Sequence, residues 1–409
     1  MGQEPLADDQ NGALQAHDHR ILGPALDLFM FSDYSPGIAA WMPKGMILYN
    51  QLLNLIREEY EKRGFDEVRA PLIWNSDLWK KSGHYEHFKS NMFFLESEGQ
   101  EFALKPMNCP GHCVMMGQRI RSYRELPVRY AEMSPLHRNE PSGSLEGLKR
   151  VRSFSQDDAH IFCRPDQMGS EILSNIEFVR YIYAKLGFQF RVELALRPAN
   201  SIGSDELWKL AEDSLRTAIQ KAKLEFKENP GEGAFYGPKI EFHLRDAKDH
   251  YWQCGTIQLD FNLPGKDRFN LQYRDQENHL VHPVMIHRAI FGSFERMIAC
   301  LIEYYKGEFP VWLAPEQVRI IPVHQSHHSY AQAHHLELRG AKIRSSVDLN
   351  EENLGPRVKN ALDQKIPYIV VVGNKEVVNG SIAVRSRQDA KPRDSNLNEL
   401  IGIVQAQLK

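Results

Sequence analysis

The chain has 409 residues, of which 42% are hydrophobic and 25% are charged, a balance typical of a folded enzyme with two or three domains. Its formal net charge of −3 is not that of an overt nucleic-acid binder, and no apolar stretch approaches the roughly 20 residues that span a membrane. Five cysteines, an odd number, favour a reducing cytoplasm over a disulfide framework.

The beginning of the chain changes from a polar segment to a helical pattern. Residues 1–16 are polar and acidic and predict a flexible leader rather than a secretory or transit signal. Residues 45–63 place apolar side chains at close to helical spacing, with Lys62 and Arg63 in the last turn, so they predict a helix. The segment 65–73 then predicts a strand. An ordinary amphipathic helix packed on a strand explains this stretch equally well by itself.

Strand and helix patterns continue through the middle of the chain. Strands are predicted at 102–106, 126–133, 152–162, 239–244 and 251–263. Helices are predicted at 165–186 and 205–223. A strand that runs into a helix is predicted at 283–305.

A proline-bounded segment, Pro310–Pro315, predicts a hinge between domains. From Trp312 onward the chain carries 13 lysines and arginines against 10 aspartates and glutamates. Strands separated by helices in this part predict a small α/β layer domain. Its mildly basic balance permits RNA binding without demonstrating it.

The densest chemistry in the sequence lies in one segment. Arg138 and Glu140 stand at a turn, and two further arginines, Arg150 and Arg152, follow a Gly/Ser-rich loop. Arginines grip phosphates through bidentate hydrogen bonds. Residues 156–160 read Gln-Asp-Asp-Ala-His. Because side chains alternate along a strand, an extended segment would direct Gln156, Asp158 and His160 into one cavity.

This segment resembles the second signature motif of class II aminoacyl-tRNA synthetases, in the form found in threonyl-tRNA synthetases. Residues 45–73 resemble the first motif, which builds a homodimer interface, and residues 287–298 (HRAIFGSFERMI) resemble the third. The resemblance implies an α+β catalytic domain with an antiparallel sheet flanked by helices, followed by a small α/β anticodon-binding domain. The implied boundaries are a leader at 1–16, a catalytic domain at 17–310 and an anticodon-binding domain at 311–409.

The resemblance implies that ATP, with Mg²⁺, activates L-threonine to threonyl-adenylate, which is transferred to the 3′ end of tRNA(Thr) with release of AMP and pyrophosphate. The implied ATP-binding residues are Arg138, Glu140, Arg150, Gln253, Thr256 and Arg296. The implied threonine-binding residues are Gln156, Asp158, Tyr236 and Gln258. The implied catalytic residues are Arg138, Arg296, Lys239 and His84, of which the last is associated with the terminal ribose of the tRNA and with proton movement.

A zinc site is also implied by the resemblance, with Cys109, His160 and His287 as ligands. These residues lie far apart in sequence, so their spacing alone does not nominate them. Zinc can take the amino and hydroxyl groups of threonine, and a site that must coordinate a hydroxyl rejects valine, which lacks one, but not serine. A local metal knuckle formed by His112 and Cys113 is a rival reading that we do not favour.

The resemblance further implies tRNA anticodon contacts by Glu376, Arg385, Lys359 and Glu351. The last two depart from the bacterial pattern, which has arginine and asparagine there: lysine loses the guanidinium fork, and a glutamate would favour cytosine-type donors or point away. A histidine-rich run over 324–335 is expected to be a solvated loop and helix rather than a second metal site.

Three readings remain open at this stage. The first is a threonine–tRNA ligase without the family's N-terminal editing region, which would mischarge serine measurably. The second is a catalytically silent, synthetase-like protein that binds tRNA. The third is a class II ligase for another amino acid such as proline or serine, although the Cys/His/His set points away from proline.

Overall fold

The computed structural model describes residues 16–245, 251–387, 389 and 391–408, so nearly all of the predicted leader lies outside the described residues. The chain divides into two compact units. The first unit contains the described residues of Met1–Ser32, Ala39–Asn54 and Ile298–Lys409; the second contains those of Asp33–Ile38 and Leu55–Met297. None of the described helices is long and apolar enough to cross a membrane. The domain boundaries expected from the sequence stay predictions.

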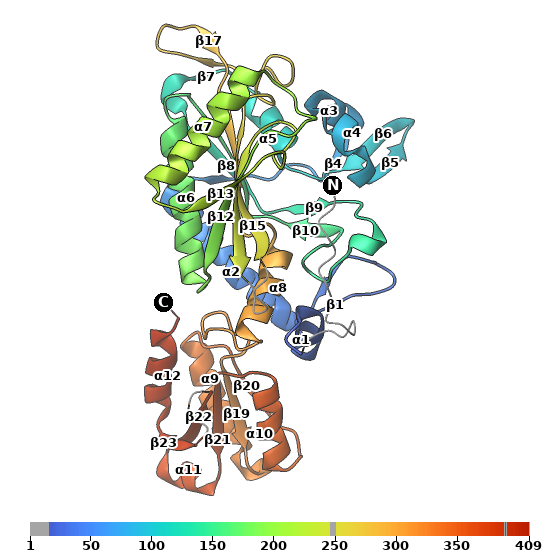
Figure 1. The fold of residues 1–409 in the computed structure, drawn as a ribbon. Coiled ribbons are helices and arrows are strands. Elements are labelled where there is room, and N and C mark those ends of the chain that lie inside the picture. The colour runs from blue at the N-terminus through green and yellow to red at the C-terminus, as the bar shows by residue number, and fades with distance from the viewer. Residues whose placement is uncertain (1–15, 246–250, 388, 390, 409) are drawn as a thin grey trace. The chain divides into compact units, whose positions relative to one another are not determined.

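The second unit is built on an eight-stranded sheet with the order β13-β12-β14-β15-β18-β11-β8-β3 (Figure 1). Its strands are β3 (Asp66–Glu67), β8 (Val128–Glu132), β11 (Asp158–Cys163), β12 (Phe190–Ala195), β13 (Phe226–Asn229), β14 (Lys239–Arg245), β15 (Tyr251–Asp260) and β18 (Val284–Ala289). Neighbours from β12 to β8 pair antiparallel, which confirms the expected antiparallel sheet. Only the edge pairs, β13 on β12 and β3 on β8, are parallel.

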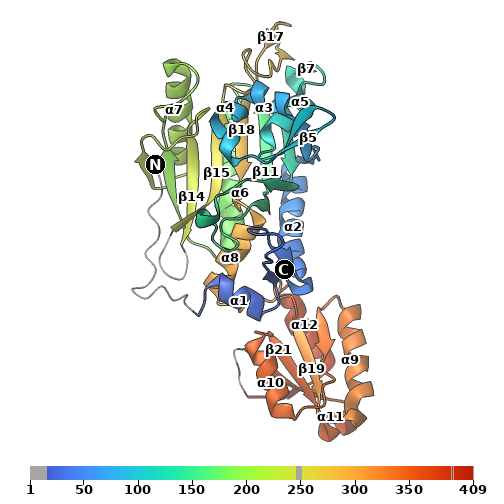
Figure 2. The ribbon, with the colours of Figure 1, turned by 90° about the vertical axis from the view of Figure 1, so that its right-hand side faces the viewer.

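The two faces of this sheet differ in chemistry. Helices α6 (Met168–Lys185) and α7 (Asp205–Lys221) pack on it, as both ribbon views show (Figures 1 and 2). Ile161, Leu259 and Ile286 lie side by side in the register and are fully buried. Because side chains alternate along each strand, the residues between them point to the opposite face.

The described residues also form further helices and four small sheets of two or three strands. The other helices outside the C-terminal sheet are α1 (His19–Ala25), α2 (Pro43–Arg63), α3 (Ser76–Ser82), α4 (His84–Phe88), α5 (Cys109–Met116) and α8 (Phe294–Tyr305). The smaller sheets are formed by β1 (Phe29–Met30) with β2 (Ala40–Trp41), β9 (Pro135–His137) with β10 (Ser153–Ser155), β4 (Ile73–Asn75) with β6 (Gln100–Leu104) and β5 (Phe94–Ser97), and β17 (Leu280–Val281) with β16 (Tyr273–Arg274) and β7 (Arg121–Ser122).

The first unit contains a five-stranded sheet with the order β20-β19-β21-β22-β23. The strands are β19 (Val318–Pro322), β20 (Ser345–Val347), β21 (Tyr368–Val372), β22 (Ile382–Ser386) and β23 (Arg393–Ser395), and the helices are α9 (His328–Gly340), α10 (Leu354–Asp363), α11 (Asn374–Asn379) and α12 (Leu397–Ala406). Side chains of α9 and α12 share one buried cluster with the sheet, and those of α10 share another. This layered arrangement confirms the small α/β domain expected from the sequence.

Two predicted strands were wrong in their extent. The predicted strand 65–73 shortens to the two residues of β3. The predicted strand 152–162 is two strands, β10 and β11, which belong to different sheets. Between them Asp157 accepts hydrogen bonds from the backbone N–H groups of Ile290 and Phe291, so the chain is pinned where it passes from one sheet to the other.

A buried ion pair ties this crossing to the rest of the second unit. Arg288 donates to the carboxylate and to the carbonyl oxygen of Asp157, both at 3.0 Å, and to the Tyr60 hydroxyl at 3.1 Å. Its guanidinium also lies 5.0 Å from the ring centroids of Tyr60, Phe65 and Phe178. A buried charge of this kind is tolerated only because it is paired.

We predict that Asp157→Ala lowers the free energy of unfolding of the second unit by about 3–5 kcal/mol, because it leaves the buried Arg288 cation unpaired. The matched control is Glu67→Ala, which breaks an ion pair with Arg57 whose side chains are 41% and 44% exposed, and should cost less than about 1 kcal/mol. Denaturant titration followed by circular dichroism measures both. Equal losses in the two variants would contradict the prediction.

Candidate active site and metal centre

A cavity of about 360 Å³ opens in the second unit. Its lining includes every residue expected to bind ATP, threonine or zinc, namely Cys109, Arg138, Glu140, Arg150, Gln156, Asp158, His160, Tyr236, Lys239, Gln253, Thr256, Gln258, His287 and Arg296. These residues come from positions spread over nearly 190 residues of sequence. The fold therefore brings together in one place what the sequence keeps apart.

The floor of the cavity is set by the register of three antiparallel strands. His160 on β11 lies directly opposite His287 on β18, which in turn lies opposite Gln258 on β15. On the same two strands, β15 and β18, Thr256 pairs with Ala289 two residues away from the pair Gln258 and His287, and Thr256 also lines the cavity. These residues occupy the face of the sheet opposite the apolar side chains described above, because the side chains alternate.

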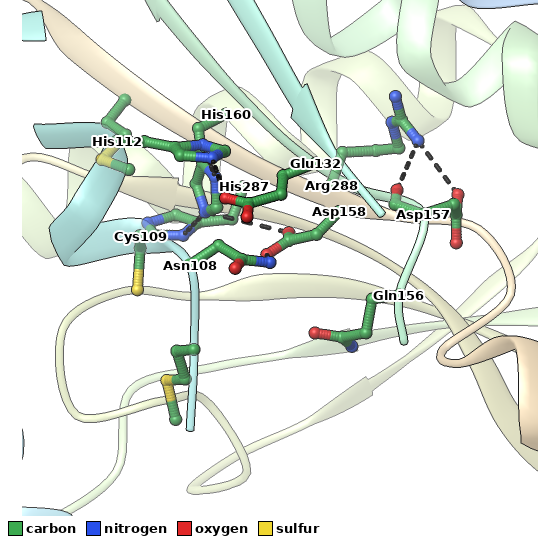
Figure 3. Close-up of polar contacts among 12 residues, drawn as sticks. Asn108, Cys109, His112, Glu132, Gln156, Asp157, Asp158, His160, His287 and Arg288 are labelled. Atoms are coloured by element: carbon green, nitrogen blue, oxygen red, sulfur yellow. Dashed lines mark hydrogen bonds and ion pairs between the residues drawn. The ribbon is translucent and has the colours of Figure 1, made fainter. Parts of the chain in front are cut away.

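Three potential metal ligands converge beside this floor. Cys109 begins α5, while His160 and His287 lie on β11 and β18; their ligand atoms all lie within 4.8 Å of one another (Figure 3). His160 Nε2 is 3.0 Å from His287 Nδ1, and all three residues are buried. Burial lowers the pKa of His160 well below its usual value, so the ring is neutral, the form that binds metals. One thiol and two imidazoles fit the donor preferences of Zn²⁺.

The second ring nitrogen of His287 also has a partner. His287 Nε2 lies 3.0 Å from the buried carboxylate of Asp260, which itself accepts from the backbone N–H groups of Asn262 and Leu263. A metal-binding histidine usually donates its other N–H to such an acceptor, which fixes the ring. This arrangement leaves Nδ1 of His287 directed toward the other two ligands.

Two further triads of potential ligands occur among the described residues. In one, Asp18 is engaged by Arg20 and His19 by Glu303; in the other, Glu241 is paired with Lys239 at 2.6 Å beside Glu193 and His243. These groups already have partners within the protein. They therefore fit a metal less well than Cys109, His160 and His287.

Two arginines line the cavity with their directions fixed by main-chain carbonyls. Arg138 follows β9, donates from Nε to Pro106 O at 3.3 Å, and lies 5.0 Å from the Phe154 ring centroid. Burial lowers the pKa of Arg138 from its usual value. Arg296 lies in the first turn of α8 and donates to Lys149 O at 3.0 Å and to Gln253 O at 2.8 Å. A cavity with two held guanidinium groups suits a phosphate-bearing ligand.

Polar side chains near the metal triad are likewise held in place (Figure 3). Gln156 donates to Gly292 O at 2.6 Å. Asn108 donates to one oxygen of Asp158 at 2.9 Å, and the other oxygen lies 3.8 Å from His160 Nε2. Such prior hydrogen bonds reduce the cost of ordering the site when a ligand binds.

Known families match both parts of the chain. Residues 92–305 match the tRNA synthetase class II core domain (G, H, P, S and T), and residues 317–407 match the anticodon binding domain. The chain belongs to the class II aminoacyl-tRNA synthetases.

The relatives of this class II synthetase include threonyl enzymes. It is 48% identical over 384 residues to a threonine–tRNA ligase from Caldanaerobacter subterraneus subsp. tengcongensis, covering 94% of this chain and 59% of that relative. The RNA binding domain of threonyl-tRNA synthetase from Cryptosporidium parvum Iowa II has a TM-score of 0.91 at 44% identity, covering 95% and 98% of the two chains. A putative threonyl-tRNA synthetase from Aeropyrum pernix has a TM-score of 0.80 at 27% identity, covering 96% of each. The chain thus spans about 59% of the length of its curated relative.

One expected catalytic residue of the synthetase does not line the cavity. His84 is fully buried, with Nδ1 2.8 Å from Ser82 Oγ and Nε2 3.1 Å from Met107 Sδ and 3.9 Å from Cys109 Sγ. Burial lowers its pKa to about 3. Its assignment to proton movement stays a prediction, and any contact with tRNA would need a rearrangement of this pocket.

The expected anticodon residues all lie in the first unit. Glu376 accepts from the backbone N–H of Gly373 at the start of α11, and Glu351 accepts from Gln325 at 2.9 Å. Lys359 is exposed on α10, and Arg385 lies on β22. The histidine-rich run forms a short 3-10 turn (Gln325–His327) and α9; within it, His327 is buried against Asn374 rather than solvated.

Sequence reasoning missed several residues that shape the cavity. Lys149 lines it, with Nζ 4.0 Å from the Trp252 ring centroid, and Asn108 and Asp260 hold residues of the site. For Lys149 and Asn108, the only sequence signal of a role in the site is that each directly precedes a predicted site residue, Arg150 and Cys109 respectively. Asp260 could have been found as the residue two positions after Gln258 on the same strand face.

We predict that the purified chain binds one zinc ion and that Cys109→Ala loses it, because the buried triad then has too few donors. Cys113→Ala is the matched control: this cysteine lies on the same helix, is equally buried and contacts Met285 Sδ at 3.8 Å. Metal analysis by mass spectrometry after exhaustive dialysis measures the zinc content. Retention of zinc by Cys109→Ala, or loss by Cys113→Ala, would refute the assignment.

Proposed function

We propose that this chain carries threonine–tRNA ligase activity. In the first step a carboxylate oxygen of L-threonine attacks the α-phosphorus of ATP, a bond forms to phosphorus, and the bond to pyrophosphate breaks. In the second step the terminal ribose hydroxyl of tRNA(Thr) attacks the carbonyl carbon and AMP leaves. The observation that carries the proposal is that two held arginines and a Cys/His/His triad line one cavity.

The arginine side of the cavity would bind ATP with its Mg²⁺. Arg138 would grip the α-phosphate and Arg296 the γ-phosphate, so that negative charge developing during attack is offset by groups already fixed in direction. Glu140 would accept from the adenine amino group, and Arg150 would lie over the outer phosphates. Gln253 and Thr256, joined by a 3.2 Å hydrogen bond, would complete the nucleotide wall.

The triad side of the cavity would bind threonine. Cys109, His160 and His287 would hold zinc, and the chemistry supplied by the bound ion is coordination of the amino and hydroxyl groups of threonine, which valine cannot match. Asp158 would accept from the hydroxyl, and Gln156 would contact the amino group.

Three further residues would complete the pocket. Tyr236 and Gln258 would close it around the amino acid, with Gln258 already held by its hydrogen bond to Gly237 O. Lys239 would stabilise charge on the adenylate. Its ammonium group is held at 2.6 Å by Glu241.

The C-terminal α/β domain would bind the anticodon through Glu376, Arg385, Lys359 and Glu351. Two of these, Glu376 and Glu351, are acceptors that already hold other groups, whereas the two cations suit the RNA backbone or base edges. His84 would act near the terminal ribose during transfer. We further propose a cytoplasmic homodimer formed through the segment 45–73.

We predict that the chain catalyses threonine-dependent exchange between ATP and pyrophosphate, with little exchange for valine or proline. Arg296→Ala should lower kcat/KM for exchange by at least about 100-fold, because a fixed charge on the phosphates is lost. The control is Arg268→Ala, since Arg268 lies in the same unit but does not line the cavity. No exchange with any amino acid would support a silent tRNA-binding protein, and exchange with proline alone would support a different ligase.

We predict that Arg385→Ala raises KM for tRNA(Thr) by about tenfold, the order expected from losing one charge-assisted contact, and leaves threonine-dependent exchange unchanged. Arg393→Ala is the control, because this arginine is exposed on β23 of the same sheet and lies 3.8 Å from Glu399. Aminoacylation rates measured at varied tRNA concentrations give KM for tRNA(Thr) in each of the two variants. The anticodon assignment of Arg385 fails if both variants behave like the parent chain.

A further inference from the structure

A series of buried hydrogen bonds runs from His160 through His112 to Glu132, and neither His112 nor Glu132 lines the cavity (Figure 3). His160 Nδ1 lies 2.8 Å from His112 Nδ1, and His112 Nε2 lies 3.0 Å from one carboxylate oxygen of Glu132. The other oxygen accepts from Lys105 Nζ at 2.6 Å, from the backbone N–H of Ala70 at 3.0 Å, and from Ser134. His160, His112, Glu132 and Lys105 are each at most 1% exposed.

The partners at the far end fix the direction of every hydrogen bond in this series. Glu132 is surrounded by donors, so it is an ionised acceptor; hydrogen bonds from His112, Lys105 and Ser134 outweigh the effect of burial and lower its pKa to about 2. His112 must therefore donate from Nε2, which leaves Nδ1 as its acceptor. His160 must then donate from Nδ1, and its Nε2 keeps the lone pair that faces Cys109 and His287.

We propose that His112 and Glu132 are positioning residues that hold His160 in the one tautomer and ring orientation able to bind the metal. This inference rests on the zinc site of the proposed function. It gives the two ligand histidines matching supports: His287 is held directly by the carboxylate of Asp260, and His160 is held by the carboxylate of Glu132 through an intervening imidazole. Partners of this kind orient metal-binding histidines and raise their basicity.

The ion pair between Lys105 and Glu132, at the end of this hydrogen-bond series, is buried, and burial of charges costs free energy. Removing two ions from water carries a large desolvation cost, and apolar residues of similar size are often as stabilising. The Lys105–Glu132 pair is therefore not explained by stability alone. The pair reaches the ligand histidine His160 through His112, and it holds a charged acceptor where His112 needs one.

The rival reading of His112 as a metal ligand does not fit this geometry. His112 Nε2 contacts the carboxylate of Glu132, and His112 Nδ1 contacts His160 Nδ1 rather than His160 Nε2, the nitrogen that lies 3.0 Å from His287. The group of potential ligands around Cys109 contains His160 and His287 but not His112. His112 thus supports a ligand rather than being one.

The test measures zinc affinity by competition with a chromophoric chelator, and the visible absorption of the cobalt-loaded chain, for the full chain and its variants. His112→Phe keeps an aromatic ring beside Tyr130 but cannot accept from His160; we expect zinc affinity about 10–100-fold weaker and a weaker cobalt d–d band. His112→Gln offers an amide oxygen and an N–H in the same place and should recover part of the affinity. His137→Phe is the matched control, because His137 lies in the same unit and contacts Ser153 instead.

A second variant guards against misfolding. Glu132→Leu combined with Lys105→Met removes both charges together, so no buried ion is left unpaired, and also removes the acceptor that His112 needs; it should weaken zinc binding as His112→Phe does. If both folded variants bind zinc as tightly as the parent chain, the positioning role is overturned while the zinc site stands. If the parent chain binds no zinc, the zinc site of the proposed function and this inference both fall.

Discussion

The register of three antiparallel strands is the constraint on which the rest of the site depends. β11, β18 and β15 align so that His160, His287 and Gln258 stand in one row across the sheet. A slip of one residue in any of these strands would turn its polar side chains toward the helices and its apolar ones toward the cavity. The apolar face of the same strands, buried under α6, specifies the register and thereby specifies the site.

A polar row in the middle of a sheet is stable only if its groups have partners, since an unpaired buried polar group costs about 1–3 kcal/mol. The second unit supplies those partners from outside the row. Asp260 holds His287, His112 holds His160, and Asp157 holds Arg288 together with two backbone N–H groups. Asp260 and Asp157 are in turn held by main-chain or cationic donors, and His112 contacts the carboxylate of Glu132, so the interior of the site is organised before any ligand arrives.

The sequence predicted those features that depend on local pattern. The helix expected at 45–63 is α2, because its apolar spacing extends over several turns, and Gln156, Asp158 and His160 do line one cavity. The break between β10 and β11 was missed because it is imposed by Arg288 and Ile290, more than 130 residues away. The helix α5, which begins with Cys109, was missed as well, since it has only eight residues and contains Pro110 and Gly111. The grouping of Cys109 with two distant histidines came from resemblance, because pairing register is not a local property.

Anomalous X-ray scattering at the zinc edge from crystals of the chain grown with L-threonine tests the central claim most directly. Our account predicts one zinc peak per chain, bound by Cys109 Sγ, His160 Nε2 and His287 Nδ1, with threonine in contact with the ion. A peak elsewhere, a zinc ion bound by His112, or the absence of zinc beside ordered threonine would contradict it.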